Sequence, residues 1–295
     1  MTFDLSKTCK HCNSETKKKY LRDIKRLSEM AGNENIPKTG TWLFADKLIK
    51  KYKALPLKQR RTLSVAGWKA TLAYGLDKKV WSELMTNDIL AYKKNRSKQK
   101  LTTEEKEKIP AKGFSALKKA STEYKRSIKL DLAKKTLKSL AIYGRYLIFR
   151  FYAEVAFRNG LATVQIGEGL NKLIKKKGVY TIFMKQHKTS DKMGEITVVL
   201  SKALSKVIGT YIKYRKQYDL KHSYLLVNQK GEPLSKKSLG VILAQLTRRY
   251  FGKSFGTRLI RIMKVQSESG TLEKAKKLAN DMLHSMAQSQ QYNKK

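Results

Sequence analysis

The sequence has no long apolar run and no export signal, and both absences narrow what the protein can be. Its longest apolar stretch, residues 146–157, contains Arg150 and Glu154 and is shorter than the roughly 20 residues that a membrane-spanning helix needs. Residues 1–7 lack the apolar core of a signal peptide. We therefore expect an intracellular protein that does not cross a membrane.

Cysteine is also scarce, since Cys9 and Cys12 are the only two in the chain. A disulfide framework is therefore excluded, and a reducing compartment fits best. With His11 between them, the two cysteines resemble half of a zinc knuckle, but a structural zinc site needs four ligands and the other histidines lie far along the chain. We expect an incidental pair, with a zinc site as the minor alternative; a redox role is less favoured still, because no strand–helix–strand pattern surrounds the pair. The sequence thus predicts no bound metal and no cofactor.

Acidic residues are few, and the excess of basic ones is the strongest feature of the composition. Lysine and arginine number 65 against 23 aspartates and glutamates, so the formal net charge is +42. Hydrophobic residues make up 41% of the chain, enough to build a core, so the chain is not a disordered basic tail. A folded chain this basic repels itself unless an anion is near. Nucleic acid is the first candidate partner, and an anionic membrane surface is the second.

The first part of the chain, residues 1–94, shows helical periodicity interrupted by glycine and proline. Ser14 is the expected cap of a first helix, and Pro56 ends the second. A third helix is expected over residues 57–74, with a basic polar side, and a fourth around residues 80–92. These patterns predict a small basic helical bundle.

Residues 95–114 differ from what precedes them. Two charged runs are followed by Pro110 and Gly113. A charged run is usually a solvated surface, but this one also lies where a clamp around DNA would need a hinge. We expect residues 95–114 to be a linker between two domains.

Residues 115–295 mix helix and strand patterns. One long helical pattern covers about residues 130–157, and β-branched runs bounded by Gly178 and Gly194 predict three short strands, at 163–166, 179–184 and 195–200. Helical patterns then return in four segments, at 203–218, 236–250, 255–265 and 272–283. The expected fold class is α+β, mainly α, with a helical domain followed by a domain that holds a small three-stranded sheet.

Six residues of this second part stand out by their chemical type and order: Arg158, Lys188, Arg258, Arg261, His284 and Tyr292. The first ends the long helical pattern, the lysine lies at the turn between the second and third expected strands, and the spacing of the next two arginines puts both on one helix face. Taken singly, each has an ordinary alternative. An arginine or lysine among 65 is usually solvated or touches a phosphate, a lone histidine is usually structural, and a tyrosine near a terminus usually packs on the surface.

In this order, the six residues resemble the catalytic set of the tyrosine recombinases, or phage integrases, which consists of Arg, Lys, His-x-x-Arg, His or Trp, and Tyr. The resemblance covers most of the chain and implies a SAM-like core-binding domain at 1–94, a linker at 95–114 and a catalytic domain at 115–295. It assigns Tyr292 as the nucleophile. The lysine-rich composition resembles recombinases of large eukaryotic DNA viruses and related mobile elements.

The sequence departs from the family pattern in three places. Arg258 stands where histidine is usual, although the related type IB topoisomerases place a lysine there. Arg158 lacks the common Thr-Gly-Leu-Arg-x-x-Glu surroundings. Only three residues follow Tyr292, where many family members carry a helix that docks on a neighbouring subunit.

The resemblance implies a specific chemistry. The tyrosine attacks a DNA phosphodiester and forms a 3′-phosphotyrosine, the arginines stabilise charge on the non-bridging oxygens, and the lysine protonates the leaving 5′ oxygen. Rejoining is the reverse reaction, so neither ATP nor metal is needed. The implied partners are double-stranded DNA and three further copies in a homotetramer on paired sites, with no membrane, in the nucleus or cytoplasm. The implied use is to integrate or excise a viral or mobile genome.

Two alternatives remain open at this point. A type IB topoisomerase uses the same chemistry as a monomer and relaxes supercoils without exchanging strands. A protein derived from an integrase could also bind DNA or RNA without catalysis, and the altered surroundings of Arg158 keep this alternative open.

Overall fold

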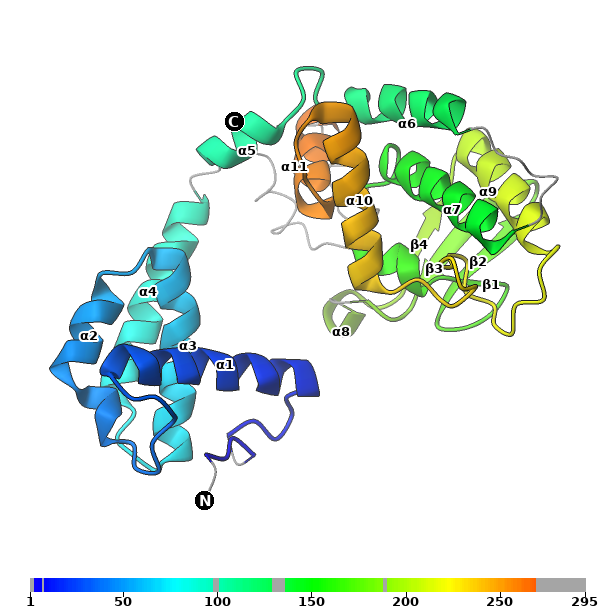
Figure 1. Cartoon of the computed structure of the whole chain (residues 1–295). Helices are drawn as coiled ribbons and strands as arrows, with labels where there is room; N and C mark the ends of the chain where they lie inside the picture. Colours follow the sequence, from blue (N-terminus) through cyan, green and yellow to red (C-terminus); the bar gives the residue numbers. More distant parts are fainter. Residues whose placement is uncertain (1–2, 7, 98–100, 129–135, 188–189, 269–295) are drawn as a thin grey trace. The chain divides into compact units, whose positions relative to one another are not determined.

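The computed structural model describes residues 3–6, 8–97, 101–128, 136–187 and 190–268 (Figure 1). The chain divides into two compact units, Met1–Lys98 and Gln99–Lys295, and each has its own hydrophobic core. The division falls inside the segment that the sequence marks as a linker. No helix among the described residues is long and apolar enough to cross a membrane.

The regular elements described in the first unit are all helices, as expected. Its elements are α1 (Ser14–Ala31), η1 (Thr41–Phe44), α2 (Asp46–Lys53), α3 (Leu57–Ala73) and α4 (Lys79–Ser97). The cap of α1 is Asn13, one residue before the expected Ser14, and its side chain accepts a hydrogen bond from the Thr16 amide at 2.9 Å. Glycine at position 32 adopts a left-handed φ of 101° and ends the helix.

The core of this unit is built around Trp81 of α4, which is fully buried. Gly67 on α3 makes room for it, because a Cβ atom there would lie 2.2 Å from the indole ring. The indole nitrogen donates to the Leu43 carbonyl at 3.1 Å, and the ring of Tyr52 packs against the indole edge with centroids 5.4 Å apart. The small residue therefore determines how closely α3 and α4 pack.

The two cysteines belong to an N-terminal segment that covers this core. Leu5 and Cys9 are buried there, and the amine of Lys69 donates to the Thr8 carbonyl at 2.5 Å. The structure joins Cys9 to Cys12 in a disulfide, so the expectation of two reduced thiols is wrong for this pair. The described residues contain no group of three or more His, Cys, Asp or Glu side chains that could hold a metal ion.

The second unit begins with two helices that the sequence patterns did not indicate. These are α5 (Thr103–Lys108) and α6 (Ser115–Ser127). Helix α5 lies within the segment expected as a linker. It forms because Thr102 and Glu105 make a reciprocal capping box, which satisfies the first amides of a very short helix.

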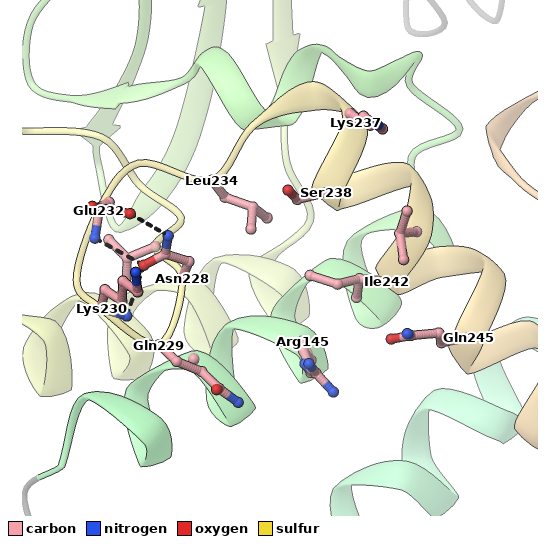
Figure 2. A pocket seen from close by; sticks show the side chains of 13 residues that line it. Arg145, Asn228, Gln229, Lys230, Glu232, Leu234, Lys237, Ser238, Ile242 and Gln245 are labelled. Atoms are coloured by element: carbon pink, nitrogen blue, oxygen red, sulfur yellow. Dashed lines mark hydrogen bonds between the residues drawn. The ribbon is translucent and has the colours of Figure 1, made fainter.

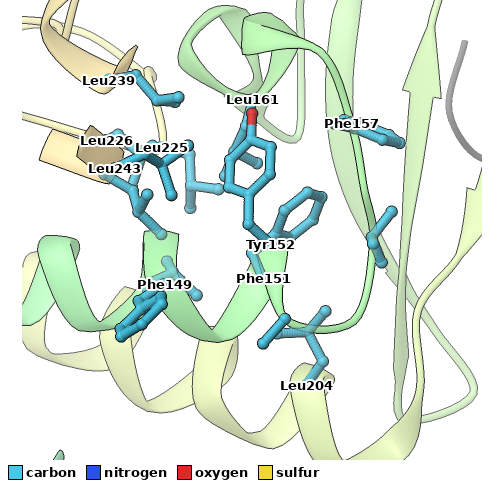
Figure 3. Close-up of a cluster of buried hydrophobic side chains, with 14 of the residues drawn as sticks. Phe149, Phe151, Tyr152, Phe157, Leu161, Leu204, Leu225, Leu226, Leu239 and Leu243 are labelled. Atoms are coloured by element: carbon cyan, nitrogen blue, oxygen red, sulfur yellow. The ribbon is translucent and has the colours of Figure 1, made fainter. Parts of the chain in front are cut away.

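Helix α7 (Leu137–Tyr152) is the central helix of the second unit, and α6, α9 (Lys202–Arg215) and α10 (Lys236–Phe251) pack against it. A helix was expected over residues 130–157. Residues 130–135 lie outside the described residues, and the helix ends at Tyr152, with Ala153 as its C-cap. Figure 3 shows the aromatic cluster at its C-terminal end, where Phe149, Phe151 and Phe157 are buried with leucines from α9 and α10. This core fixes where the chain leaves α7 and enters η3 (Asn159–Thr163).

The sheet has four strands, so the expectation of three strands is corrected. Their order is β1 (Gln165–Ile166), β2 (Asn171–Lys176), β3 (Val179–Met184) and β4 (Ile196–Val199), with β1 parallel to β2 and the other neighbours antiparallel. The missing strand was β2, whose lysines resemble a solvated charged run. The turn to β3 is Lys177-Gly178, and both residues have positive φ, 46° and 80°, as a two-residue hairpin turn requires.

Two more helices complete the described part of the unit. The short α8 (Ser190–Met193) lies between β3 and β4, and α11 (Thr257–Glu268) follows α10. The helix expected over residues 272–283 lies outside the described residues.

Candidate active site

Arg158 lies at the cap position of η3, just after the aromatic cluster of α7. Its backbone carbonyl accepts a hydrogen bond of 2.6 Å from the hydroxyl of Tyr152. Tyr152 is fully buried, and this burial raises the pKa of the phenol, while the charge of Arg261 acts in the opposite direction. The phenol therefore stays protonated and holds the Arg158 backbone in place. Only the apolar residues around this tyrosine could have drawn attention to it in the sequence.

Arg261 lies on α11 and is only 6% exposed. Its Nε donates to the carbonyl of Thr257, one turn earlier, at 3.1 Å. Because its charge also acts on Tyr152, Arg261 and the backbone of Arg158 lie near one buried phenol, although more than 100 residues separate them in the sequence. Packing thus places the backbone of one expected residue and the charge of another near the same side chain.

Arg258 shares the helix with Arg261 but not its environment. Its side chain is 54% exposed and forms an ion pair with Glu105 of α5, whose side chain is 10% exposed. Glu105 also accepts from the Thr102 amide at 3.1 Å, so the same carboxylate caps α5 and holds Arg258. In addition, Lys253 donates to the Glu107 carbonyl, and the two contacts fasten α5 onto the region of α11.

Two asparagines link η3 to its neighbours, and both were missed in the sequence. The amide of Asn159 donates to the Lys236 carbonyl of α10 at 3.0 Å and accepts from the Thr257 hydroxyl of α11 at 3.1 Å. Asn171, at the start of β2, is 3% exposed and donates to the Thr163 hydroxyl at 2.7 Å. An asparagine supplies a donor and an acceptor on one short side chain, which is why it can join segments in this way.

Asn171 also fixes the base of the loop between β3 and β4. It donates to the Gln186 carbonyl at 2.8 Å and accepts from the Gln186 amide at 2.9 Å. The Nε2 atom of His187 lies 3.0 Å from the Gly194 carbonyl, and this contact joins the two ends of the loop. The expected lysine, Lys188, belongs to this loop by sequence but lies outside the described residues. His284 and Tyr292, near the end of the chain, also lie outside the described residues.

A separate cleft lies beside this site and contains none of the six expected residues (Figure 2). Its volume is about 650 Å³, and its walls come from α7, the turn at residues 227–234, and α10. The cations Arg145, Lys230 and Lys237 line it together with the amides of Gln229 and Gln245. Cations and amides of this kind can bind phosphates and base edges.

The sequence matches no protein-family model and no curated protein. Solved structures do match. A XerH site-specific recombinase bound to its difH substrate before cleavage is 15% identical, with a TM-score of 0.63 over 99% of this chain and 81% of that chain. A post-cleavage complex of XerH with a palindromic difH substrate gives a TM-score of 0.62 at 15% identity, over 98% of this chain and 79% of the other. The chain therefore has the fold of the tyrosine recombinases, with a four-stranded sheet.

Proposed function

We propose that this protein is a site-specific DNA recombinase that cuts and rejoins duplex DNA through a covalent bond to Tyr292. The observation that carries the proposal is that the Arg158 backbone and the Arg261 charge both act on one buried phenol, in a fold shared with XerH. The proposal takes the two guanidinium groups, held on different elements, as the receptor for the oxygens of one phosphate.

The proposed reaction balances without an external energy source. The phenol of Tyr292 gives up its proton to solvent, its oxygen bonds to the phosphorus of a phosphodiester, and the bond from that phosphorus to the 5′ oxygen breaks. Arg158 and Arg261 bind the non-bridging oxygens as charge builds there, and Arg258 adds a third cation. Lys188 gives the leaving oxygen its proton, and His284 is assigned to the same site. The reverse reaction rejoins the strand.

The remaining contacts with DNA would come from both units. In the second unit, Lys230, Lys237 and Gln245 in the cleft are suited to phosphates and base edges. In the first, the basic side of α3 carries Lys58 and Arg61. We propose that the units at 1–98 and 99–295 clamp the duplex and that four copies assemble on two sites. Integration or excision of a viral or mobile genome is the use suggested by the lysine-rich composition.

The test is to trap the covalent adduct. The protein is mixed with a randomised library of nicked duplexes and quenched with detergent, and the DNA linked to protein is sequenced. Enrichment of one site supports the proposal. DNA binding with no adduct would instead support a non-catalytic protein.

A second assay separates recombination from simple relaxation. Supercoiled plasmid lacking the enriched site is incubated with the protein. Plasmid that stays supercoiled supports a site-specific recombinase, whereas relaxation would support a type IB topoisomerase.

A further inference from the structure

We propose that Asn159 is the positioning residue that holds Arg158 and Arg261 in the geometry needed for strand cleavage. This inference rests on the proposed function and deepens it. Asn159 lies outside the expected catalytic set, and its side chain acts through protein partners on both sides rather than through DNA.

A continuous path of bonds runs through Asn159 from one arginine to the other. Asn159 follows Arg158 directly in the chain. Its Oδ1 accepts from the Thr257 hydroxyl at 3.1 Å, and the carbonyl of the same threonine accepts from Arg261 Nε at 3.1 Å. Thr257 is thus held at both ends. A shift of Asn159 therefore moves the two guanidinium groups relative to each other.

The other end of the amide anchors this path to α10. Its Nδ2 donates to the Lys236 carbonyl at 3.0 Å, at the first residue of the helix. Gly240 lies against the same nitrogen, and a Cβ there would lie 3.4 Å away. Helix α10 also lines the cleft with Lys237 and Gln245, so the amide lies between the arginine site and the proposed DNA contacts.

Only an amide can serve all of these partners. Alanine removes both bonds, and aspartate keeps the acceptor but sets a charged oxygen against the Lys236 carbonyl. The hydroxyl of Thr257 can be removed on its own, because valine has nearly the same shape. Serine in place of Thr257 keeps the hydroxyl and serves as the conservative variant.

The experiment measures single-turnover adduct formation on the duplex recovered from the library, with DNA affinity measured beside it. We expect Asn159→Ala and Thr257→Val each to slow adduct formation by about 10- to 100-fold, as misplacement of reacting groups by about 1 Å does. DNA affinity should change by less than about twofold, because phosphate contacts elsewhere dominate it. Thr257→Ser should restore most of the rate. The double variant should be no slower than the slower single variant, since both break one path.

Two controls separate positioning from a structural role. Thr122→Val removes an exposed hydroxyl whose bond goes to the Lys118 carbonyl of its own helix, and it should leave the rate unchanged. A methylphosphonate at the scissile position lacks one negative oxygen and needs the arginine pair less, so the defect of Asn159→Ala should shrink on that duplex. A defect of the same size on both duplexes would contradict the positioning role.

The outcomes distinguish this inference from the proposed function. If the wild-type protein forms no adduct, the proposed function fails and the inference with it. If the wild-type protein forms adduct and the variants match it within about threefold, only the inference is overturned. If Asn159→Ala does not fold, the comparison of Thr257→Val with Thr257→Ser decides, and equal rates for these two would overturn it.

Discussion

The two units of the molecule place their buried charged side chains in different surroundings. In the first unit, Asp88 is 6% exposed, pairs with Arg60 at 3.4 Å and accepts from the Tyr52 hydroxyl, so opposite charges meet inside a helical core. In the second unit, Arg261 is 6% exposed, and its charge acts on the buried phenol of Tyr152, which also binds the Arg158 backbone. In the proposed site the guanidinium groups of Arg158 and Arg261 bind one phosphate, and that anion relieves the repulsion between the two cations. The first network stabilises the fold, and the second is suited to a phosphate.

The largest expected effect is at the nucleophile. Replacing Tyr292 with phenylalanine removes the only oxygen of that side chain and should abolish the covalent adduct. DNA affinity should stay close to that of the wild-type protein, because the interface is driven by charge. Adduct yield and a binding isotherm measure the two quantities. An adduct surviving in Tyr292→Phe would transfer the role to another tyrosine, with Tyr224 and Tyr250 tested next.

The next effect compares the two arginines of α11. Arg261→Lys should slow cleavage by about 10²- to 10³-fold, the usual cost of one lost transition-state donor, because a lysine cannot reproduce the planar fork. Arg258→Lys should cost about tenfold at most, because that side chain is largely exposed and a lysine can keep the ion pair with Glu105. Single-turnover rates at saturating protein give both values. Equal losses at the two positions would argue against the alignment of Arg258-x-x-Arg261 with the family motif.

The third prediction concerns the buried pair in the first unit. Asp88→Asn keeps an acceptor for Tyr52 but removes the charge that faces Arg60. We expect the free energy of unfolding to fall by about 1–3 kcal/mol, measured by denaturant titration of the full chain. The cleavage rate of the folded protein should not change. A tenfold loss of rate with unchanged stability would show that the network in the first unit serves catalysis as well.

The parts of the site that the sequence predicted and the parts that it missed differ in kind. Arg158, Arg258 and Arg261 could be proposed from the sequence because their chemical types occur in a fixed order. Glu105, Asn159 and Asn171 were missed because their roles depend on partners that are distant in the sequence. Glu105, for example, lies 153 positions from Arg258 and acquires its role only when α5 packs near α11.

The same reasoning applies to the fold. Strand β3 was predicted with its observed bounds, because its side chains are β-branched, aromatic and largely buried. Strand β2 was not, because its lysines lie on a half-exposed face and only the pairing with β3 makes it a strand. Helix α5 depends on a capping box and on contacts with residues near α11, which a charged run does not reveal. Local patterns identify elements whose own residues are buried, and they fail where tertiary partners decide.

The smallest effect expected is on the salt dependence of binding. A plot of the logarithm of DNA affinity against the logarithm of salt concentration should have a slope of about −0.9 for each phosphate neutralised. We expect the full chain to neutralise on the order of ten phosphates. Removing residues 1–98 should flatten this slope if, as proposed, the first unit supplies a large share of the contacts. Removing residues 1–110 should flatten it no further but should also slow cleavage, because it deletes Glu105. An unchanged slope after the first deletion would contradict the clamp.

The central claim is most directly tested by identifying the residue that becomes attached to DNA. The adduct of the wild-type protein is digested with nuclease and protease, and the modified peptide is sequenced by mass spectrometry. The account predicts one modified residue, Tyr292, joined to a nucleotide through its 3′ phosphate. Attachment through a 5′ phosphate, or at any other residue, would contradict it.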